Sequence, residues 1–96
     1  MAELTLISES TYLLKPIVEA ALTHELGLLE VSVRQTEQRL QTFEKKYVMN
    51  TQDFLARYEN DQLEETMDFA EWIGEFRLLE RLREKAKTLR GIHFAN

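Results

Sequence analysis

The chain has 96 residues, of which 44% are hydrophobic and 30% charged, and its formal net charge is −5. A chain of this length forms about one domain, and the mixed composition argues against intrinsic disorder. Three Gly and one Pro supply too few turn residues for a many-stranded β-sandwich or barrel, so the composition favours an all-α fold.

The residue types also limit location and chemistry. There is no cysteine, which excludes disulfides, thiolate metal sites and a cysteine nucleophile. The first residues lack the basic segment and the continuous apolar core of a secretory signal. No apolar run approaches the length of a membrane span. We therefore expect a cytoplasmic protein without a membrane association.

Residues 1–15 are expected to form a short strand or an extended arm. The β-branched and apolar residues from Leu4 to Ile7 favour a strand over a helix. No other segment has the pattern of a strand, and a lone strand is not stable. The prediction is therefore that this strand pairs with a second copy of the chain or with a partner.

A long helix is predicted over residues 16–49. Pro16 suits the first turn of a helix, and Asn50 and Thr51 mark the end of the segment. Between them, residues recur at alternating steps of four and three over more than three heptads. This heptad seam, with one polar member, consists of Leu22, Leu26, Leu29, Val33, Thr36, Leu40, Phe43 and Tyr47.

Two further helices follow. Thr51 is the predicted N-cap of a short helix over residues 52–60. The third helix is predicted over residues 66–90, with Gly91 where a glycine commonly ends a helix. Its first half is acidic and its second half basic, which complements the helix dipole. The sequence thus predicts a single helical domain over residues 1–96.

The length of the first predicted helix implies self-association. About 34 residues span roughly 50 Å, which is more than the other two helices cover. A second copy of the same helix would bury the remainder, so we predict a homodimer arranged as a helical bundle or coiled coil. The residues assigned to self-association are Leu22, Leu26, Leu29, Val33 and Leu40.

No pattern indicates a catalytic residue, a cofactor or a metal ion, and we expect a protein that is not an enzyme. His24 and Glu25 begin like a metalloprotease motif, but the second ligand position is occupied by Leu28. There is no nucleophile elbow and no glycine-rich phosphate loop. The basic cluster near the C-terminus is interrupted by acids and the pI is about 5.0, which disfavours nucleic-acid binding.

The third predicted helix carries a row of carboxylates at helical spacing. This acidic row comprises Glu64, Asp68, Glu71 and Glu75. It can be a solvated face, hold a hard cation, or dock a basic partner. The solvated face is favoured, because the Glu-x-x-His pairs of di-iron bundles and a calcium loop are absent. Of the other two interpretations, docking is favoured over a ligand site. The aromatic row Phe69, Trp72 and Phe76 is core by default, and an interface anchor in the alternative.

Two segments resemble a family of small bacterial and archaeal proteins. They run from Phe43 to Phe54 (FEKKYVMNTQDF) and from Asp68 to Trp72 (DFAEW), and the resemblance covers roughly the C-terminal half of the chain. In that family, FEKKYGM-[ST]-x-x-[EDQ]-F leads through an acidic linker into D-F-x-E-W. This chain departs at Val48, where the family usually has Gly, so a helix that ends there in relatives is free to run on here.

Members of that family look like antitoxins encoded beside small toxins, which are often RNase-like. The resemblance implies neutralisation of a cognate basic toxin by protein contact, without catalysis. The acidic row and the aromatic row are then the partner-binding residues. The alternative is a structural, self-associating helical adaptor with no toxin partner, in which the heptad seam carries the function.

Overall fold

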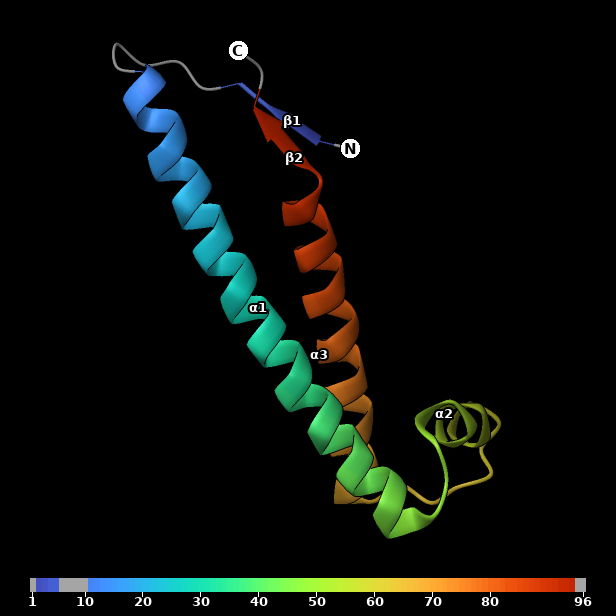
Figure 1. Cartoon of the computed structure of the whole chain (residues 1–96). Coiled ribbons are helices and arrows are strands. Elements are labelled where there is room, and N and C mark those ends of the chain that lie inside the picture. Colours follow the sequence, from blue (N-terminus) through green and yellow to red (C-terminus); the bar gives the residue numbers. More distant parts are fainter. Residues whose placement is uncertain (1, 6–10, 95–96) are drawn as a thin grey trace.

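The computed structural model describes residues 2–5 and 11–94. In chain order the elements are β1 (Ala2–Leu4), α1 (Thr11–Tyr47), α2 (Thr51–Glu59), α3 (Met67–Arg90) and β2 (Ile92–Phe94). The long helices α1 and α3 pack antiparallel as a hairpin, and α2 lies beside the end where the chain turns (Figure 1). The molecule is elongated, 60 × 22 × 17 Å. The predicted all-α helical fold is confirmed.

Helix α1 differs from its predicted bounds at both ends. It begins at Thr11, so Pro16 lies inside the helix and not at its start. It ends at Tyr47 because Val48 adopts a left-handed conformation with φ of 52°. The N–H of Met49 then donates to the carbonyl of Glu44 at 3.2 Å, the long-range bond of a Schellman motif. The expectation that the helix runs on through Val48 is wrong.

The other two helices begin with side-chain caps. Asn50 caps α2, and its side-chain oxygen accepts from the N–H of Asp53 at 2.8 Å. The prediction of Thr51 as the cap is wrong by one residue, since Thr51 is already helical. Thr66 caps α3 by accepting from the N–H of Phe69 at 3.1 Å. Each cap satisfies a backbone donor that the first turn leaves without a partner.

The two short strands pair with each other. β1 and β2 form a parallel two-stranded sheet in which Ala2 lies opposite Ile92 and Leu4 opposite Phe94. The prediction that the N-terminal strand requires a second copy or a partner is wrong, because the chain's own C-terminal segment supplies the neighbouring strand. A three-residue strand is too short to show a pattern in the sequence. Ile7, part of the predicted strand, lies outside the described residues.

The core lies between α1 and α3 and continues under α2. Its buried cluster contains Leu40, Phe54, Phe69, Trp72 and Leu79, and Leu29 and Ala86 are buried further along the hairpin. Thr36, the polar member of the seam, is also fully buried. Its hydroxyl donates to the carbonyl of Ser32 at 2.8 Å and accepts from Arg39 at 3.1 Å, so its burial leaves no polar atom unpaired.

The heptad seam is the side of α1 that faces α3. Leu29 and Leu40 are only 5% and 6% exposed. At the other end of the seam, Leu22 and Leu26 line a hollow of about 170 Å³ with Leu89 of α3. The seam is thus covered from within the chain, which removes the argument that a second copy must cover it.

Ion pairs cross between α1 and α3 along the length of the hairpin. The acidic part of α1 meets the basic end of α3, and the basic end of α1 meets the acidic start of α3. The pairs are Glu25–Lys85 at 3.7 Å, Glu30–Arg90 at 3.1 Å, Glu37–Arg83 at 3.0 Å, Arg39–Glu75 at 2.8 Å and Lys46–Asp68 at 2.6 Å. Exposed pairs add little stability individually, but their pattern matches only an antiparallel register.

Candidate functional site

The two segments that resemble the small-protein family, residues 43–54 and 68–72, meet where α2 packs on the hairpin. Trp72 of α3 is fully buried, and its ring lies parallel to that of Phe54 with the centroids 3.9 Å apart. It also stacks with Phe43 of α1 at 5.6 Å, while Tyr47 packs against Phe69 at 5.0 Å. All three helices therefore contribute to one aromatic cluster.

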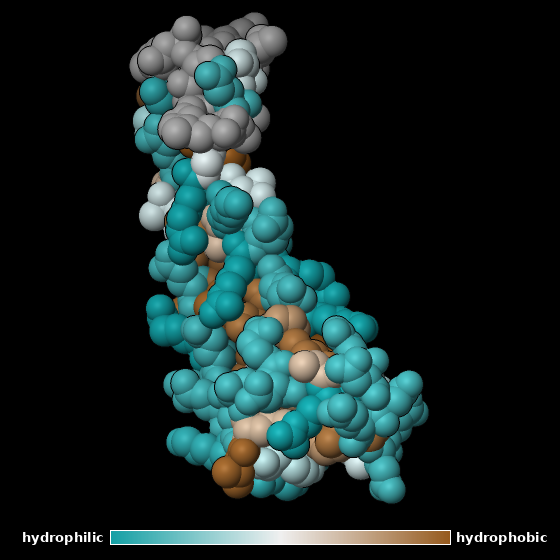
Figure 2. All heavy atoms as spheres, turned by 90° about the vertical axis from the view of Figure 1, so that its right-hand side faces the viewer, coloured by the Kyte–Doolittle hydropathy of each residue, from teal (hydrophilic) through white to brown (hydrophobic). Residues whose placement is uncertain are grey.

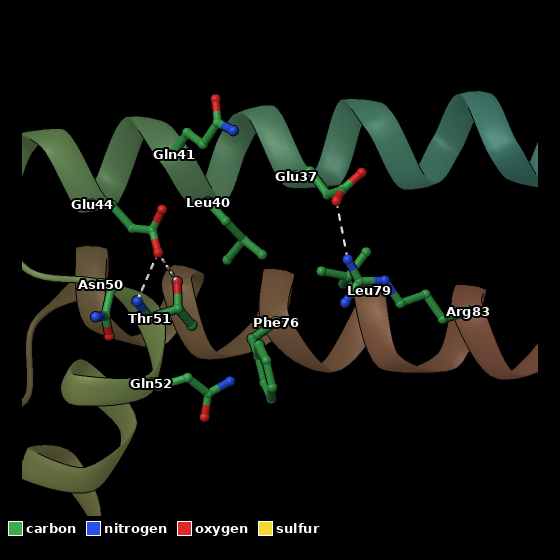
Figure 3. Close-up of a pocket in the computed structure, with 10 residues that line it drawn as sticks. All are labelled: Glu37, Leu40, Gln41, Glu44, Asn50, Thr51, Gln52, Phe76, Leu79 and Arg83. Atoms are coloured by element: carbon green, nitrogen blue, oxygen red, sulfur yellow. Dashed lines mark hydrogen bonds and ion pairs between the residues drawn. The ribbon is translucent and has the colours of Figure 1, made fainter.

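A buried hydrogen-bond network fixes the start of α2 beside this cluster. The indole N–H of Trp72 donates to the hydroxyl oxygen of Thr51 at 3.0 Å. The backbone N–H and the hydroxyl of Thr51 both donate to a carboxylate oxygen of Glu44, at 2.7 and 3.0 Å (Figure 3). One threonine thus joins α2 to both long helices.

A second network ties the start of α3 to the end of α1. One carboxylate oxygen of Asp68 accepts from the ammonium of Lys46 at 2.6 Å and from the phenol of Tyr47 at 2.5 Å. The hydrogen bond from Lys46, followed by that from Tyr47, lowers the pKa of Asp68. The hydrogen bonds to Asp68 raise the pKa of Lys46 and of Tyr47. Asp68 therefore joins the start of α3 to the end of α1.

The structure divides the predicted acidic row into two kinds of carboxylate. Asp68 and Glu75 pair with cations of α1. Glu71 is exposed on α3, and Glu64 is exposed in the linker before it. Within residues 2–5 and 11–94, neither Glu64 nor Glu71 has a cation partner. Only these two members of the row are free to meet another molecule.

The aromatic row belongs to the core. Trp72 is fully buried and Phe69 is 9% exposed. Phe76 is half-buried and packs against the core cluster. A partner cannot reach Phe69 or Trp72 without opening the hairpin, so the structure favours the core interpretation over an interface anchor.

The end of the hairpin that carries α2 is strongly acidic. Between Thr51 and Glu75 there are eight acids and a single base, Arg57. Six of the acids are exposed and form no ion pair in the described chain. We call these six the acidic end: Asp53, Glu59, Asp61, Glu64, Glu65 and Glu71. Hydrophilic atoms cover most of the molecule's lower part in Figure 2, which looks onto the hairpin from the α2 side.

A second exposed surface, on the outer side of α1, was not found by sequence analysis. Leu13, Ile17, Leu28 and Val31 are 54%, 66%, 51% and 43% exposed. At 100° per residue they fall on one side of the helix, about half a turn from the seam. The stronger heptad signal of the seam concealed this second, shorter set of apolar residues.

A shallow hollow of about 240 Å³ lies between the end of α1, the start of α2 and α3 (Figure 3). Leu40, Phe76 and Leu79 line it together with polar side chains. All three charged groups in its lining already have partners, because Glu37 pairs with Arg83 and Glu44 accepts from Thr51. The hollow is smaller than the roughly 300–1,000 Å³ of typical ligand pockets. Thr51 supplies the one hydroxyl in its lining, and this group is buried and already hydrogen-bonded to Glu44 and Trp72.

Comparison with known proteins finds no matching family model, no similar curated protein and no similar solved structure. In the described ranges, no three His, Asp or Glu side chains are grouped where they could hold a metal ion. The helices in the same part of the chain include none that is long and apolar enough to cross a membrane.

Proposed function

We propose that the protein is a non-catalytic, antitoxin-like binding protein that neutralises a small basic toxin through its acidic end. The observation that carries this proposal is the contrast between two sets of carboxylates. Five acids pair with cations across the hairpin, whereas the six acids of the acidic end have no such partner in the described residues. Unpaired charge of one sign steers an oppositely charged protein and selects it over other partners.

The contacts of residues 43–54 and 68–72 support the same role. Many of their residues join α2 and the start of α3 to α1, through the aromatic cluster and the two hydrogen-bond networks. Glu71, in the DFAEW segment, is exposed and makes no such contact. We assign Glu71 to the centre of the docking surface, with Glu64 and Glu65 of the linker beside it along the chain.

The test is a charge reversal that spares the fold. Reversing the whole acidic row would place lysines against Lys46 and Arg39 of α1, where Asp68 and Glu75 now lie. A loss of binding would then not be separable from a change in folding. The double variant Glu64→Lys/Glu71→Lys leaves both networks and the aromatic cluster in place. The matched control is Glu80→Lys/Glu84→Lys, which changes the charge equally at two exposed acids on the far half of α3.

The tagged wild-type protein is used to capture a partner from its own host, and the captured protein is identified, purified and titrated. We expect a basic protein that arrests growth when expressed alone, with arrest relieved by the wild type and by the control. Glu64→Lys/Glu71→Lys should lose about tenfold or more in affinity, and added salt should weaken wild-type binding. Equal affinity of both double variants would contradict the assignment. Recovery of only this protein's own copies would contradict the toxin partner.

The alternative function, a self-associating helical adaptor with no toxin partner, requires an apolar surface for a second copy. The outer side of α1 offers such a surface, whereas the seam is occupied by α3. Under this alternative the pull-down returns untagged copies of the same chain and no basic protein.

A further inference from the structure

One side of α1 is apolar over about five helical turns, although it faces away from α3. From Leu13 to Val31 this outer face carries eight exposed residues, none of them Asp, Glu, Lys or Arg: Leu13, Ile17, Ala20, Ala21, His24, Gly27, Leu28 and Val31. It is about 27 Å long at 1.5 Å per residue. Single exposed apolar side chains are ordinary, but a contiguous uncharged row on the solvent side of a helix marks an interaction surface.

The row ends abruptly along the helix. Beyond Val31 the same face continues with the polar residues Gln35, Gln38, Thr42 and Lys45. The apolar part is therefore confined to the half of α1 that lies away from the acidic end. A partner that covers it has to match a surface of limited length and no charge.

The order of residues along the outer face reads nearly the same from both ends. Large apolar residues lie at 13 and 17 and again at 28 and 31, with small residues and His24 between them. Suppose that two copies of α1 lie antiparallel, with the region near residue 22 of one helix opposite the same region of the other. Leu13 then lies opposite Val31 of the other copy, and Ile17 lies opposite Leu28. At the crossing, Ala20 and Ala21 lie opposite His24, where small residues allow the helices to approach closely.

We propose that the outer face binds a second copy of this chain as an antiparallel, two-fold symmetric helix pair centred near residue 22. A two-fold interface must be complementary to itself, and the reversed residue order provides that property. The proposed interface lies on the opposite side of α1 from the heptad seam. It does not depend on the proposed function, because it uses no residue of the acidic end.

Charge selects the antiparallel over the parallel orientation. Residues 51–75 carry eight acids and one base, a net charge of −7, at one end of the molecule. A parallel pair would place two such ends side by side, in molecules only 17–22 Å wide. In the antiparallel pair each acidic end lies about 37 Å from the two-fold axis on opposite sides. That separation is several times the screening length of about 8–10 Å.

The size of the surface sets the expected affinity. A single helix pair of this length buries less than the roughly 800 Å² per partner of a standard interface. We therefore expect a dimer that forms in the micromolar range. Light scattering should show a mass that rises with concentration from 11.3 kDa toward twice that value. A monomeric mass throughout the micromolar range would overturn the proposal.

Orientation is tested by cross-linking, since the protein has no cysteine of its own. Leu13→Cys and Val31→Cys are prepared separately, one with a tag that changes its size, and oxidised alone and as a mixture. The antiparallel pair predicts a disulfide between the two different variants in the mixture and little product from either alone. Preferential cross-linking of Leu13→Cys chains to each other would overturn the proposal in favour of a parallel pair.

A charge exchange tests the register by a second route. Ile17→Lys and Leu28→Glu each place a charge in the face and should each give a monomer. Mixing them should restore a dimer, because the two changed positions face each other only in the antiparallel register. Met67→Lys, at a residue of α3 that is 77% exposed and lies outside the outer face, is the matched control and should dimerise like the wild type. Circular dichroism verifies that the helices are intact. Failure of the mixture to dimerise would overturn the register.

Discussion

Replacing Val48 by Gly is expected to stabilise the protein. Val48 follows the last residue of α1 with φ of 52°, in the left-handed region that costs an ordinary L-residue about 1–2 kcal/mol and is an outlier for a β-branched one. Its side chain is 89% exposed, so Gly sacrifices little packing. Gly has more conformational freedom in the unfolded chain, and the loss of this freedom on folding reduces the gain by about 0.5–1 kcal/mol. The net gain in the free energy of unfolding should be near 1 kcal/mol.

Thermal and urea unfolding measure this gain. For a domain of this size, 1 kcal/mol corresponds to a rise in Tm of roughly 4–8 °C. Asp61→Gly is the matched control, because Asp61 follows the C-cap of α2 with φ of 54° in a similar hydrogen-bonded turn, yet Asp tolerates this conformation better. An unchanged or lower Tm for Val48→Gly would refute the strain argument. Equal gains at the two positions would show that the branched side chain is not the cause.

Three further predictions concern Thr51, Asp68 and Gly74. Thr51→Val should destabilise by about 1–3 kcal/mol, because the indole N–H of Trp72 loses its acceptor, whereas Thr51→Ser should retain most of the stability in urea unfolding. The pKa of Asp68 is lowered in the folded state. The ionised carboxylate therefore contributes to the free energy of unfolding above the unfolded-state pKa, and this contribution is lost as pH falls through the folded-state pKa. The stabilities of the wild type and Asp68→Asn should therefore converge below about pH 4, and a constant difference down to acid pH would contradict this linkage. Gly74→Ala should raise the free energy of unfolding by about 0.5–1 kcal/mol, because the added methyl group meets no atom within 4 Å. A lower Tm for this variant would contradict the prediction.

The sequence predicted the helices well and their partners poorly. The three helices start and end within about five residues of the predicted bounds, because apolar spacing and caps are local signals. The heptad seam was correctly expected to be buried, but a heptad pattern does not say which helix covers it. The charge blocks contained that information, since the acids of α1 match the bases of α3 only in an antiparallel pair.

The candidate site was predictable in composition but not in accessibility. The acidic character of the linker and the start of α3 is visible in the sequence. Which carboxylates are free depends on where α1 places its cations, and Lys46 and Arg39 reach Asp68 and Glu75 only in the folded register. The strand β2 was missed because its pairing with β1 joins residues about ninety positions apart, beyond the reach of any local pattern.

The pairing of β1 with β2 brings both ends of the chain to the tip of the hairpin that lies farthest from α2 (Figure 1). A tag or a fused domain at either terminus therefore starts far from the acidic end, with most of the 60 Å length of the molecule between β1–β2 and that end. Because the termini are neighbours, a short peptide linker could join them into a circular chain, and new ends could be opened in the exposed segment between α2 and α3. Such a permuted chain would carry its ends beside the acidic end, and its binding would report how closely a partner approaches there.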